Sequence, residues 1–575
     1  MRSPTTNTSE KGYQLLFVQK LLDFQQYHAE TTTADFDTEF CINRQYVLDF
    51  IKATQAKIYE HIEQSGIRTF LVRLDQQISK KGIVEVFRKG IAHKGKKVFL
   101  YYPKPSSIYN PEASALHKSN TFTVTQELIY SHEASNRNRL DLTIFVNGFP
   151  IVTLELKNAY TYQAVYNAIK QYKRDRDPKD KIFNLGRCMV HFAVDTSQVF
   201  MTGQLAGKHT RFFPFNKGLN DGAAHAPFGA GNPIVPNKQK TAYLYEEVLS
   251  KTSIANLIEK FVTIVEEQDE DTGKKYTVQY FPRYHQMTVV RRLLQHAKTN
   301  GVGQRYLIQH SAGSGKSNSI TWLAHQLTSL FNDKGEIALF DSVVVVTDRQ
   351  NLDEQIRNNI KNFAQVKHIV EAITGKQKDI KVLDPSEESA SKTVHMRLAL
   401  ANNKKIIICT VQTFPNVLKA IADMEAKKVA IIIDEAHSSQ SGNAAASMNA
   451  VFSDMNFDDL ERDEEGNFST EDLVTYLIES KKMLPNASYF AFTATPKNKT
   501  LETFGVPEIY HDEHNERKTR FLPFHTYSMK QAIEEEFILD VLKNYTTHES
   551  WYKIKQINEA DTAIEFETKE ANKKI

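Results

Sequence analysis

The sequence predicts an α/β protein that contains a parallel sheet with helices on both of its faces. Short apolar runs recur through the second half of the 575 residues, each separated from the next by helix-compatible sequence: YLIQ, VVVVT, IIICT, AIIIDE and FAFTAT. Strands buried on both faces read as continuous apolar runs, and parallel neighbours need a crossover, usually a helix, between them. A chain of this length exceeds one hydrophobic core, so we expect several domains.

The overall composition is typical of a soluble globular protein. Hydrophobic residues make up 41% and charged residues 25% of the chain, and the 72 basic and 69 acidic side chains leave a formal net charge of only +3. So small a charge does not by itself indicate a nucleic-acid partner. The apolar runs are too short to cross a membrane and the N-terminus lacks the pattern of a secretory signal, so we expect a cytoplasmic protein with no membrane segment. The cysteines are too widely spaced for a disulfide framework or a metal site, and we expect buried thiols at Cys41, Cys188 and Cys409.

The composition also indicates where the chain divides. Residues 1–200 mix amphipathic helical stretches with β-rich runs such as KVFLYY, LTIFVNG and PIVTLELK. From Phe212 to Lys240, glycine, proline, asparagine and alanine replace any apolar periodicity, which is typical of a long connecting loop. We therefore predict a first domain with its connecting loop over residues 1–245, a second domain over 246–505 and a further unit that begins at 506 and runs to 575.

A phosphate-binding loop is indicated between a strand and a helix in LIQHSAGSGKSNSITWLA, residues 307–324. Glycines let backbone N–H groups approach a phosphate, and the start of the following helix adds its positive end. His310 stands where the GxxxxGK[ST] pattern has its first glycine. The alternative is a glycine-rich turn with a solvated lysine. Because the lysine can reach the β and γ oxygens and the last serine can bind Mg²⁺, we predict a nucleotide site at Gly313, Ser314, Gly315, Lys316 and Ser317.

Other polar residues fall where a nucleotide site needs them. Asp434 and Glu435 follow a predicted buried strand, where two adjacent carboxylates without a partner would be costly. We predict that Asp434 holds Mg²⁺, directly or through water, and that Glu435 polarises the water that attacks the γ-phosphate. Gln286 lies upstream, and its amide could read the adenine edge. The run FAFTATP ends in Thr493 and Thr495, whose hydroxyls suit a relay of the state of the phosphate site.

Taken in this order, the segments resemble the motor of superfamily two helicases of the DEAH form. The resemblance covers roughly residues 275–505, with the Q motif in FPRYHQ, motif I in the phosphate loop, motif Ia in VVVVTDRQNLDEQI, motif Ib in CTVQTF, motif II in DEAH and motif III in TAT. It implies a RecA-like lobe that binds ATP with Mg²⁺. Such motors take an arginine from a second lobe to stabilise the transferring phosphate. No QxxGRxxR-like element follows FAFTATP, so we expect residues 506–575 to be the start of that lobe, and residues 1–575 alone to bind ATP yet hydrolyse it poorly.

A second candidate site lies in NRLDLTIFVNGFPIVTLELKNA, where two β-rich runs flank the dipeptide NG, a strong hairpin signal. With a three-residue turn from Asn147 to Phe149, Asp141 lies directly across from Glu155. Lys157 shares that face because alternate side chains of a strand point the same way. The two carboxylates can bind Mg²⁺, while the lysine orients or activates water and offsets charge on a scissile phosphate. The alternative is an ion pair at a solvated sheet edge.

The spacing D-x13-E-x-K resembles the core of PD-(D/E)xK nucleases, with Leu140 in place of the proline. Followed by YQAVYNAIKQYKRD and a DEAH motor, this hairpin resembles the restriction subunit of type I restriction-modification enzymes, often called HsdR. The segments SEKGYQ, FVNGFPIVTLELKN and YSMKQAIEEEFILDVL resemble that family as well. The family often carries a QxxxY element after the nuclease lysine, and aligning its tyrosine on Tyr172 puts Ala168 at the glutamine.

The resemblance implies ATP-dependent translocation of double-stranded DNA coupled to Mg²⁺-dependent cleavage of unmodified DNA. It also implies methyltransferase and specificity subunits as partners, which fits the lack of an obvious base-reading module in the chain. The alternatives are a free-standing helicase-nuclease for repair or defence, and a nucleotide-regulated DNA-binding protein whose hairpin acids are structural. The basic runs FRKGIAHKGKK and YKRDRDPKDK are candidate contacts to DNA phosphates.

Overall fold

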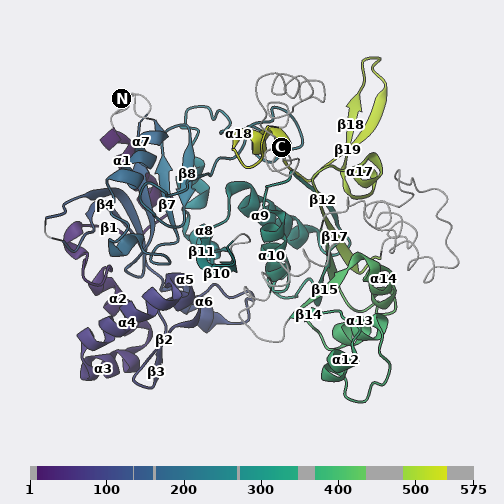
Figure 1. The fold of residues 1–575 in the computed structure, drawn as a ribbon, viewed down its shortest axis with the longest axis horizontal. Helices are drawn as coiled ribbons and strands as arrows, with labels where there is room; N and C mark the ends of the chain where they lie inside the picture. The colour runs from purple at the N-terminus through teal and green to yellow at the C-terminus, as the bar shows by residue number, and fades with distance from the viewer. Residues whose placement is uncertain are drawn as a thin grey trace, which may run out of the picture.

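The structure, a computed structural model, packs two sheet-based units against each other (Figure 1). It describes residues 10–133, 135–158, 164–268, 272–347, 360, 370–434 and 484–540. Each unit is built around a sheet of seven strands. None of the described helices is long and apolar enough to cross a membrane. Cys41, Cys188 and Cys409 are buried and form no disulfide, as predicted.

The first sheet has the strand order β1-β4-β5-β6-β7-β8-β9. β4, β5 and β6 form an antiparallel meander, whereas β6 and β7 are parallel and are joined through α7 (Val165–Arg174). The apolar residues Val165, Ala168 and Tyr172 of α7 are buried at helical spacing, which fixes the face that this helix turns to the sheet. The strands are β1 (Ala29–Thr31), β4 (Phe122–Ile129), β5 (Arg139–Val146), β6 (Phe149–Leu156), β7 (Val190–Val194), β8 (Val199–Thr202) and β9 (Phe213–Pro214).

Short helices and one small hairpin complete the first unit. The hairpin pairs β2 (Ile91–His93) with β3 (Lys96–Val98). The helices are α1 (Glu10–Gln19), η1 (Lys20–Phe24), η2 (Thr33–Asp35), α2 (Arg44–Thr54), α3 (Ala56–Ser65), α4 (Ile67–Lys81), α5 (Ile83–Lys89), α6 (Pro111–Lys118) and η4 (Lys181–Phe183).

The turn between β5 and β6 differs from the predicted one. Val146 pairs with Phe149, so the turn has two residues rather than three, and both Asn147 and Gly148 have positive φ, as the NG signal requires. A bulge at Ile151 then shifts the register by one residue, so that Leu142 lies opposite Leu154. The bulge restores the register that the three-residue turn would have given, and the predicted pairing of the acidic residues survives.

A connecting segment, residues 215–242, contains no helix or strand. It leads into η5 (Leu244–Val248), α8 (Lys251–Asn256) and η6 (Leu257–Phe261), then into the hairpin of β10 (Thr263–Gln268) and β11 (Lys275–Tyr280). The long helix α9 (Tyr284–Asn300) opens the second unit.

The second sheet is wholly parallel, with the order β14-β15-β13-β16-β17-β12-β20. All five apolar runs predicted to be strands are strands of this sheet, which is the RecA-like arrangement expected. The strands are β12 (Arg305–His310), β13 (Ser342–Thr347), β14 (Val370–Ala372), β15 (Ile406–Thr410), β16 (Val429–Ile433), β17 (Ala487–Thr493) and β20 (His525–Tyr527). The helices between them are α10 (Lys316–Leu327), α12 (Gln377–Leu383), α13 (Lys392–Ala401), η7 (Val411–Thr413) and α14 (Phe414–Ala422).

The residues after β17 extend the first RecA-like lobe beyond the predicted boundary at 505. α17 (Asn498–Phe504) is followed by a hairpin of β18 (Val506–His511) and β19 (Arg517–Leu522). β20 then joins the second sheet at its edge, parallel to β12, and α18 (Met529–Glu534) follows. The first lobe therefore reaches at least to β20, and residues 541–575 of the expected second lobe lie outside the described residues.

One apolar cluster joins the two units. It runs from Phe17 in α1 through Leu154 in β6 and Tyr245 in η5 to Ile308 in β12 and Val345 in β13, all of which are buried. Burial of apolar side chains from both sheets in one cluster holds the units together more firmly than a polar domain interface does.

Candidate functional site

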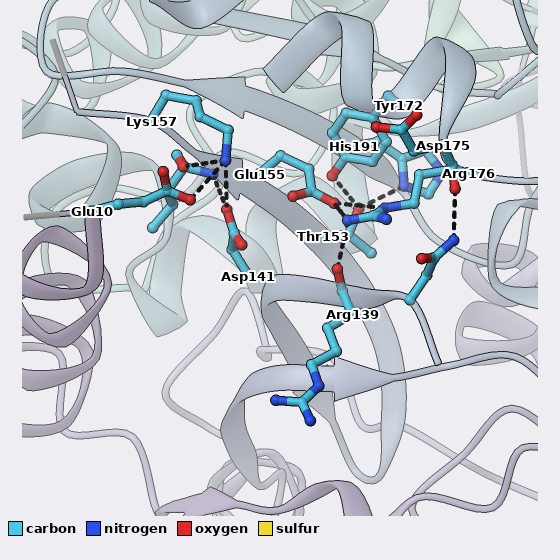
Figure 2. Close-up of polar contacts among 12 residues, drawn as sticks. Glu10, Arg139, Asp141, Thr153, Glu155, Lys157, Tyr172, Asp175, Arg176 and His191 are labelled. Atoms are coloured by element: carbon cyan, nitrogen blue, oxygen red, sulfur yellow. Dashed lines mark hydrogen bonds and ion pairs between the residues drawn. The ribbon is translucent and has the colours of Figure 1, made fainter. Parts of the chain in front are cut away.

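The two acidic residues of the predicted nuclease site lie on the β5–β6 hairpin. With Leu142 opposite Leu154, the antiparallel register puts Asp141 of β5 opposite Glu155 of β6, so that both side chains leave the same face of the sheet. Lys157 follows directly after β6, and its Nζ lies 3.8 Å from Asp141 Oδ2. The structure thus brings together the three residues that the sequence pattern predicts (Figure 2).

Asp141 and Lys157 share a small polar network. The Leu156 N–H donates to Asp141 Oδ2 over 2.6 Å, and Lys157 Nζ donates to the Leu156 carbonyl oxygen over 3.1 Å. Lys157 Nζ also donates to Glu10 Oε1 of α1 over 2.7 Å. The lysine is therefore fixed between carboxylates rather than extended into solvent.

Glu155 has a different partner. Its side chain is fully buried, and its Oε1 accepts two hydrogen bonds from Arg176, from Nε over 2.9 Å and from Nη2 over 2.7 Å. Its other oxygen, Oε2, is buried and has no hydrogen-bond partner. Figure 2 shows Glu155 between Arg176 on one side and the Asp141–Lys157 pair on the other.

This chemistry fits a divalent cation. Burial raises the pKa of Asp141 to about 6, and burial followed by the charge of Asp141 raises the pKa of Glu155 well above its usual value. A cation beside two such carboxylates favours their ionised forms, and the partnerless Oε2 provides an oxygen ligand. The described residues contain no group of three or more His, Cys, Asp or Glu side chains that could hold a metal. A cation here would therefore have two protein carboxylates and additional oxygens, the ligand set that Mg²⁺ takes with its waters.

Tyr172, aligned on the tyrosine of the QxxxY element, bonds to a threonine rather than to the carboxylates. Its hydroxyl lies 2.8 Å from Thr153 Oγ1, which in turn lies 2.7 Å from His191 Nδ1. Ala168, at the glutamine position, is buried on the same helix. The described contacts of Tyr172 fasten α7 to β6 and β7, and α7 leads directly to Arg176.

The predicted phosphate loop lies between β12 and α10. Gly313 and Gly315 have φ of 69° and 74°, and Gly315 is the left-handed residue that starts α10. Lys316 is largely buried, with its Nζ 3.3 Å from the His310 carbonyl oxygen, and Ser317 is partly exposed in the first turn. The Ser314 hydroxyl is buried without a hydrogen-bond partner. The first N–H groups of a helix have no intrahelical acceptor, so this loop fits a phosphate group.

Gln286 braces the phosphate loop from α9. Its Nε2 donates to the carbonyl oxygens of Ser314 and Gly315 over 3.0 and 3.1 Å, and its Oε1 accepts from the Arg283 N–H over 2.9 Å. Because both ends of the amide already bond within the protein, these contacts assign it a bracing role. The predicted reading of an adenine edge by Gln286 stays a prediction.

Asp434 follows β16 at the same edge of the sheet as the phosphate loop. Its side chain is 4% exposed, and its N–H donates to the Val346 carbonyl oxygen over 2.9 Å. β17 separates β16 from β12, so the two site elements are two strand spacings apart, about 10 Å. Thr493 ends β17 and is buried. Glu435, predicted to act on water, lies outside the described residues.

The sequence patterns missed four residues that contact the two sites: Glu10, Arg176, Arg283 and Phe537. Arg176 belongs to the run YKRDRDPKDK, interpreted from its charge as a DNA contact, but its side chain is only 4% exposed and pairs with Glu155. Arg283 Nη2 donates to the Gly313 carbonyl oxygen over 2.8 Å, and its guanidinium lies 3.8 Å from the centre of the Phe537 ring. That ring stacks on Phe213 of β9, so the first sheet touches the motor site through Phe537. Glu10, Arg283 and Phe537 lie in the segments SEKGYQ, FPRYHQ and YSMKQAIEEEFILDVL, whose family resemblance marks the segments but not these contacts.

Comparisons with known proteins give a family match for each of the two regions in which the predicted sites lie. Residues 13–210 match the family model described as type I restriction enzyme R protein N terminus, and residues 285–574, half of the chain, match that of the SWI2/SNF2 ATPase. The type I restriction enzyme HindI endonuclease subunit of Haemophilus influenzae is 25% identical over 66% of this chain and 31% of its own length. The SauCOLORF180P endonuclease subunit of Staphylococcus aureus is 23% identical over 74% of this chain and 36% of its own length. The chain thus spans about a third of the length of these curated relatives.

Solved structures with similar folds have low scores. A fragment assigned as an HsdR subunit of a type I restriction enzyme from Vibrio vulnificus YJ016 covers 72% of this chain and 56% of its own, with 14% identity and a TM-score of 0.26. The UvsW helicase of bacteriophage T4 covers 45% of this chain and 67% of its own, with 13% identity and a TM-score of 0.24. The assignment rests on the sequence matches instead. The chain belongs to the SWI2/SNF2 ATPase family and carries, ahead of the ATPase region, the N-terminal domain of type I restriction enzyme R proteins.

Proposed function

We propose that the protein is the motor and nuclease subunit of a type I restriction enzyme, which translocates double-stranded DNA at the expense of ATP and cleaves unmodified DNA with Mg²⁺. The observation that carries this proposal is the pair of buried carboxylates, Asp141 and Glu155, beside Lys157, in a chain that also has a phosphate loop. A buried carboxylate oxygen without a partner is costly, so a site that keeps one is a candidate for a ligand.

At the nuclease site, a bound Mg²⁺ would supply charge stabilisation at the scissile phosphate and a more acidic water. Asp141 and Glu155 would hold it, each with one oxygen already fixed by the protein. Lys157 lies 3.8 Å from Asp141, where its ammonium can orient the attacking water or offset the charge that develops on the phosphate. Glu10 holds that ammonium in place.

At the motor site, Lys316 and the N–H groups at the start of α10 would bind the β- and γ-phosphates of ATP. Ser317 and Asp434 would hold the Mg²⁺ that accompanies the nucleotide, and Glu435 would act on the attacking water. Gln286 holds the phosphate loop in its conformation by binding two of the loop's carbonyl oxygens. The phosphate loop and the β5–β6 hairpin share no residue, so ATP hydrolysis and DNA cleavage would use separate sites.

Methyltransferase and specificity subunits are the proposed partners. The test is to mix the protein with the modification and specificity proteins encoded beside it and to measure cleavage of unmodified and methylated DNA. Cleavage that requires ATP, Mg²⁺ and all three components, and that spares methylated DNA, supports the proposal. ATP-dependent cleavage without the other subunits identifies a free-standing helicase-nuclease instead. DNA binding and ATP hydrolysis by the complex without Mg²⁺-dependent cleavage make the hairpin acids structural.

A further inference from the structure

Arg176 is buried, whereas the other charged residues of the run YKRDRDPKDK are exposed or partly exposed. It follows the C-terminal end of α7, two residues after the exposed Arg174. Its Nη2 donates both to Glu155 Oε1 and to the Arg139 carbonyl oxygen of β5, the latter over 2.5 Å. Its guanidinium also lies 6.0 Å from the ring centre of Tyr130. The guanidinium is therefore anchored to both strands of the hairpin.

The way in which Arg176 binds Glu155 is unusual for this pair of groups. A guanidinium and a carboxylate commonly form two parallel hydrogen bonds that use both carboxylate oxygens. Here Nε and Nη2 both bond to Oε1, and Nη2 also donates to the Arg139 carbonyl oxygen. As a result Oε2 has no partner, although it is buried.

The oxygen without a partner, Oε2, is the oxygen of Glu155 that remains to share a cation with Asp141. Figure 2 shows Asp141 and Lys157 on the side of Glu155 opposite to Arg176. The proximity of the two acids also appears in the raised pKa of Glu155, for which Asp141 is the largest cause after burial. Arg176 thus fixes one oxygen of Glu155 and leaves the other beside the second carboxylate.

We propose that Arg176 is a positioning residue for the metal site, which orients Glu155 so that Oε2 binds a divalent cation shared with Asp141. This inference rests on the proposed nuclease function. Groups that hydrogen-bond a metal-binding carboxylate fix its orientation before the metal arrives, and their loss typically weakens metal affinity about 10–100-fold. Arg176 does not occupy the metal position, because it contacts only Oε1 and is held on the far side by Arg139.

The experiment measures binding of Mn²⁺ to the full chain without DNA or nucleotide, by electron paramagnetic resonance of the free ion. Arg176→Lys keeps the charge but loses the planar fork, and Arg176→Met loses both. We expect Mn²⁺ affinity to fall about 10–100-fold in both variants. Arg174→Lys and Arg174→Met are the matched controls, and we expect them to bind Mn²⁺ as the unaltered protein does. Circular dichroism checks that each variant is folded, and Arg176→Lys carries the test if Arg176→Met unfolds.

Asp141→Asn separates this inference from the proposed function. If the unaltered protein binds no Mn²⁺, or Asp141→Asn binds it equally well, the metal site itself is wrong and the inference fails with it. If Asp141→Asn loses binding while both Arg176 variants keep it, the metal site stands and only the role of Arg176 is overturned. Tighter Mn²⁺ binding by the Arg176 variants also overturns it, since Arg176 would then compete with the metal for Glu155.

Discussion

Asp141 and Glu155 lie opposite each other on neighbouring strands, yet each carboxylate is held from a different direction. Asp141 accepts a backbone N–H and lies beside Lys157, whereas Glu155 is paired with the buried Arg176. Substitutions at the two positions therefore leave different groups without a partner. They are not interchangeable ways of removing the metal site.

Glu155→Ala should destabilise the protein strongly, because it leaves the Arg176 guanidinium buried without a counter-ion. Removing one partner of a buried ion pair costs about 3–5 kcal/mol. Glu155→Gln keeps the side-chain volume and one acceptor for Arg176, so we expect a smaller loss. Urea unfolding of the two variants measures the difference. Equal unfolding free energies would show that Arg176 finds another partner.

The nuclease and motor activities should be separable. In a complete complex, we expect Asp141→Asn and Lys157→Ala to abolish DNA cleavage while DNA-stimulated ATP hydrolysis continues. The reason is that the hairpin contributes no residue to the loop between β12 and α10. Parallel assays of cleavage and phosphate release on the same preparations check this. Loss of both activities in a folded variant would falsify the assignment of two independent sites.

Lys316→Ala should remove tight ATP binding or its hydrolysis, and with it any cleavage that depends on translocation. The lysine is largely buried at the phosphate loop, and its loss leaves the phosphate oxygens without their main counter-ion beside Mg²⁺. Binding of a fluorescent ATP analogue and steady-state hydrolysis are the measurements. Mn²⁺ binding at the hairpin is the internal control and should be unchanged. Normal ATP-dependent cleavage by this variant contradicts the motor assignment.

Gly315→Ala should abolish ATP binding at the phosphate loop, because the new methyl group displaces Gln286 in addition to straining the backbone. A Cβ at this position would lie 2.3 Å from Gln286 Nε2, which must then leave the loop carbonyls that it binds. Gly95→Ala is the matched control, because Gly95 also has positive φ but a Cβ there meets nothing within 4 Å. We expect both to lose about 1–2 kcal/mol from the left-handed backbone. Only Gly315→Ala should also lose ATP binding, and nucleotide affinity equal to that of Gly95→Ala would contradict the bracing role of Gln286.

Acid should destabilise the fold through two buried histidines. Burial lowers the pKa of His191 to about 3, and burial with the charge of Arg292 lowers that of His525 to about 3 as well. In the unfolded chain both titrate near 6.5, so the stability that they contribute is complete above pH 6.5 and falls as the pH approaches 3. At pH 5 each histidine should have cost the fold about 2 kcal/mol.

Urea unfolding free energies of the unaltered protein and of His191→Asn at pH 7 and pH 5 isolate the part of this loss that His191 contributes. His191→Asn cannot take up a proton, so its stability should fall less steeply with pH than that of the unaltered protein. If His191 did not titrate between pH 7 and pH 5, the unfolding free energies of the two proteins would fall equally steeply with pH.

The second sheet and the acidic hairpin can be predicted from the local sequence. The contacts that position their side chains cannot. Five apolar runs predict the five central strands, because a parallel strand that is buried on both faces is a continuous apolar run and can be recognised from its own residues. β20 has only three residues and so shows no period, and its place beside β12 depends on the fold. The turn before the bulge at Ile151 also has a non-local contact, since Gly148 lies so close to the Asn43 carbonyl oxygen that a Cβ would be 2.6 Å from it.

The same limit applies to the candidate site. Asp141, Glu155 and Lys157 are visible from the hairpin signal and from the alternation of side chains along a strand, although the predicted pairing holds only because the bulge at Ile151 offsets the shorter turn. Arg176 is on another element, and nothing in the run YKRDRDPKDK distinguishes the one arginine that turns inward. Gln286 is visible in the run FPRYHQ upstream of the phosphate loop, but its contacts with that loop depend on how α9 packs beside it.

The apolar cluster that joins the two units has a mechanical consequence. Domains connected by a flexible linker tumble separately, so the distance between their active centres varies from moment to moment. Here the hairpin and the first motor lobe are parts of one packed body. In the proposed enzyme the nuclease site would therefore stay at a constant distance from the DNA-translocating ATPase lobe. The fold itself, rather than the diffusion of a tethered nuclease domain, would set the length of DNA between the two.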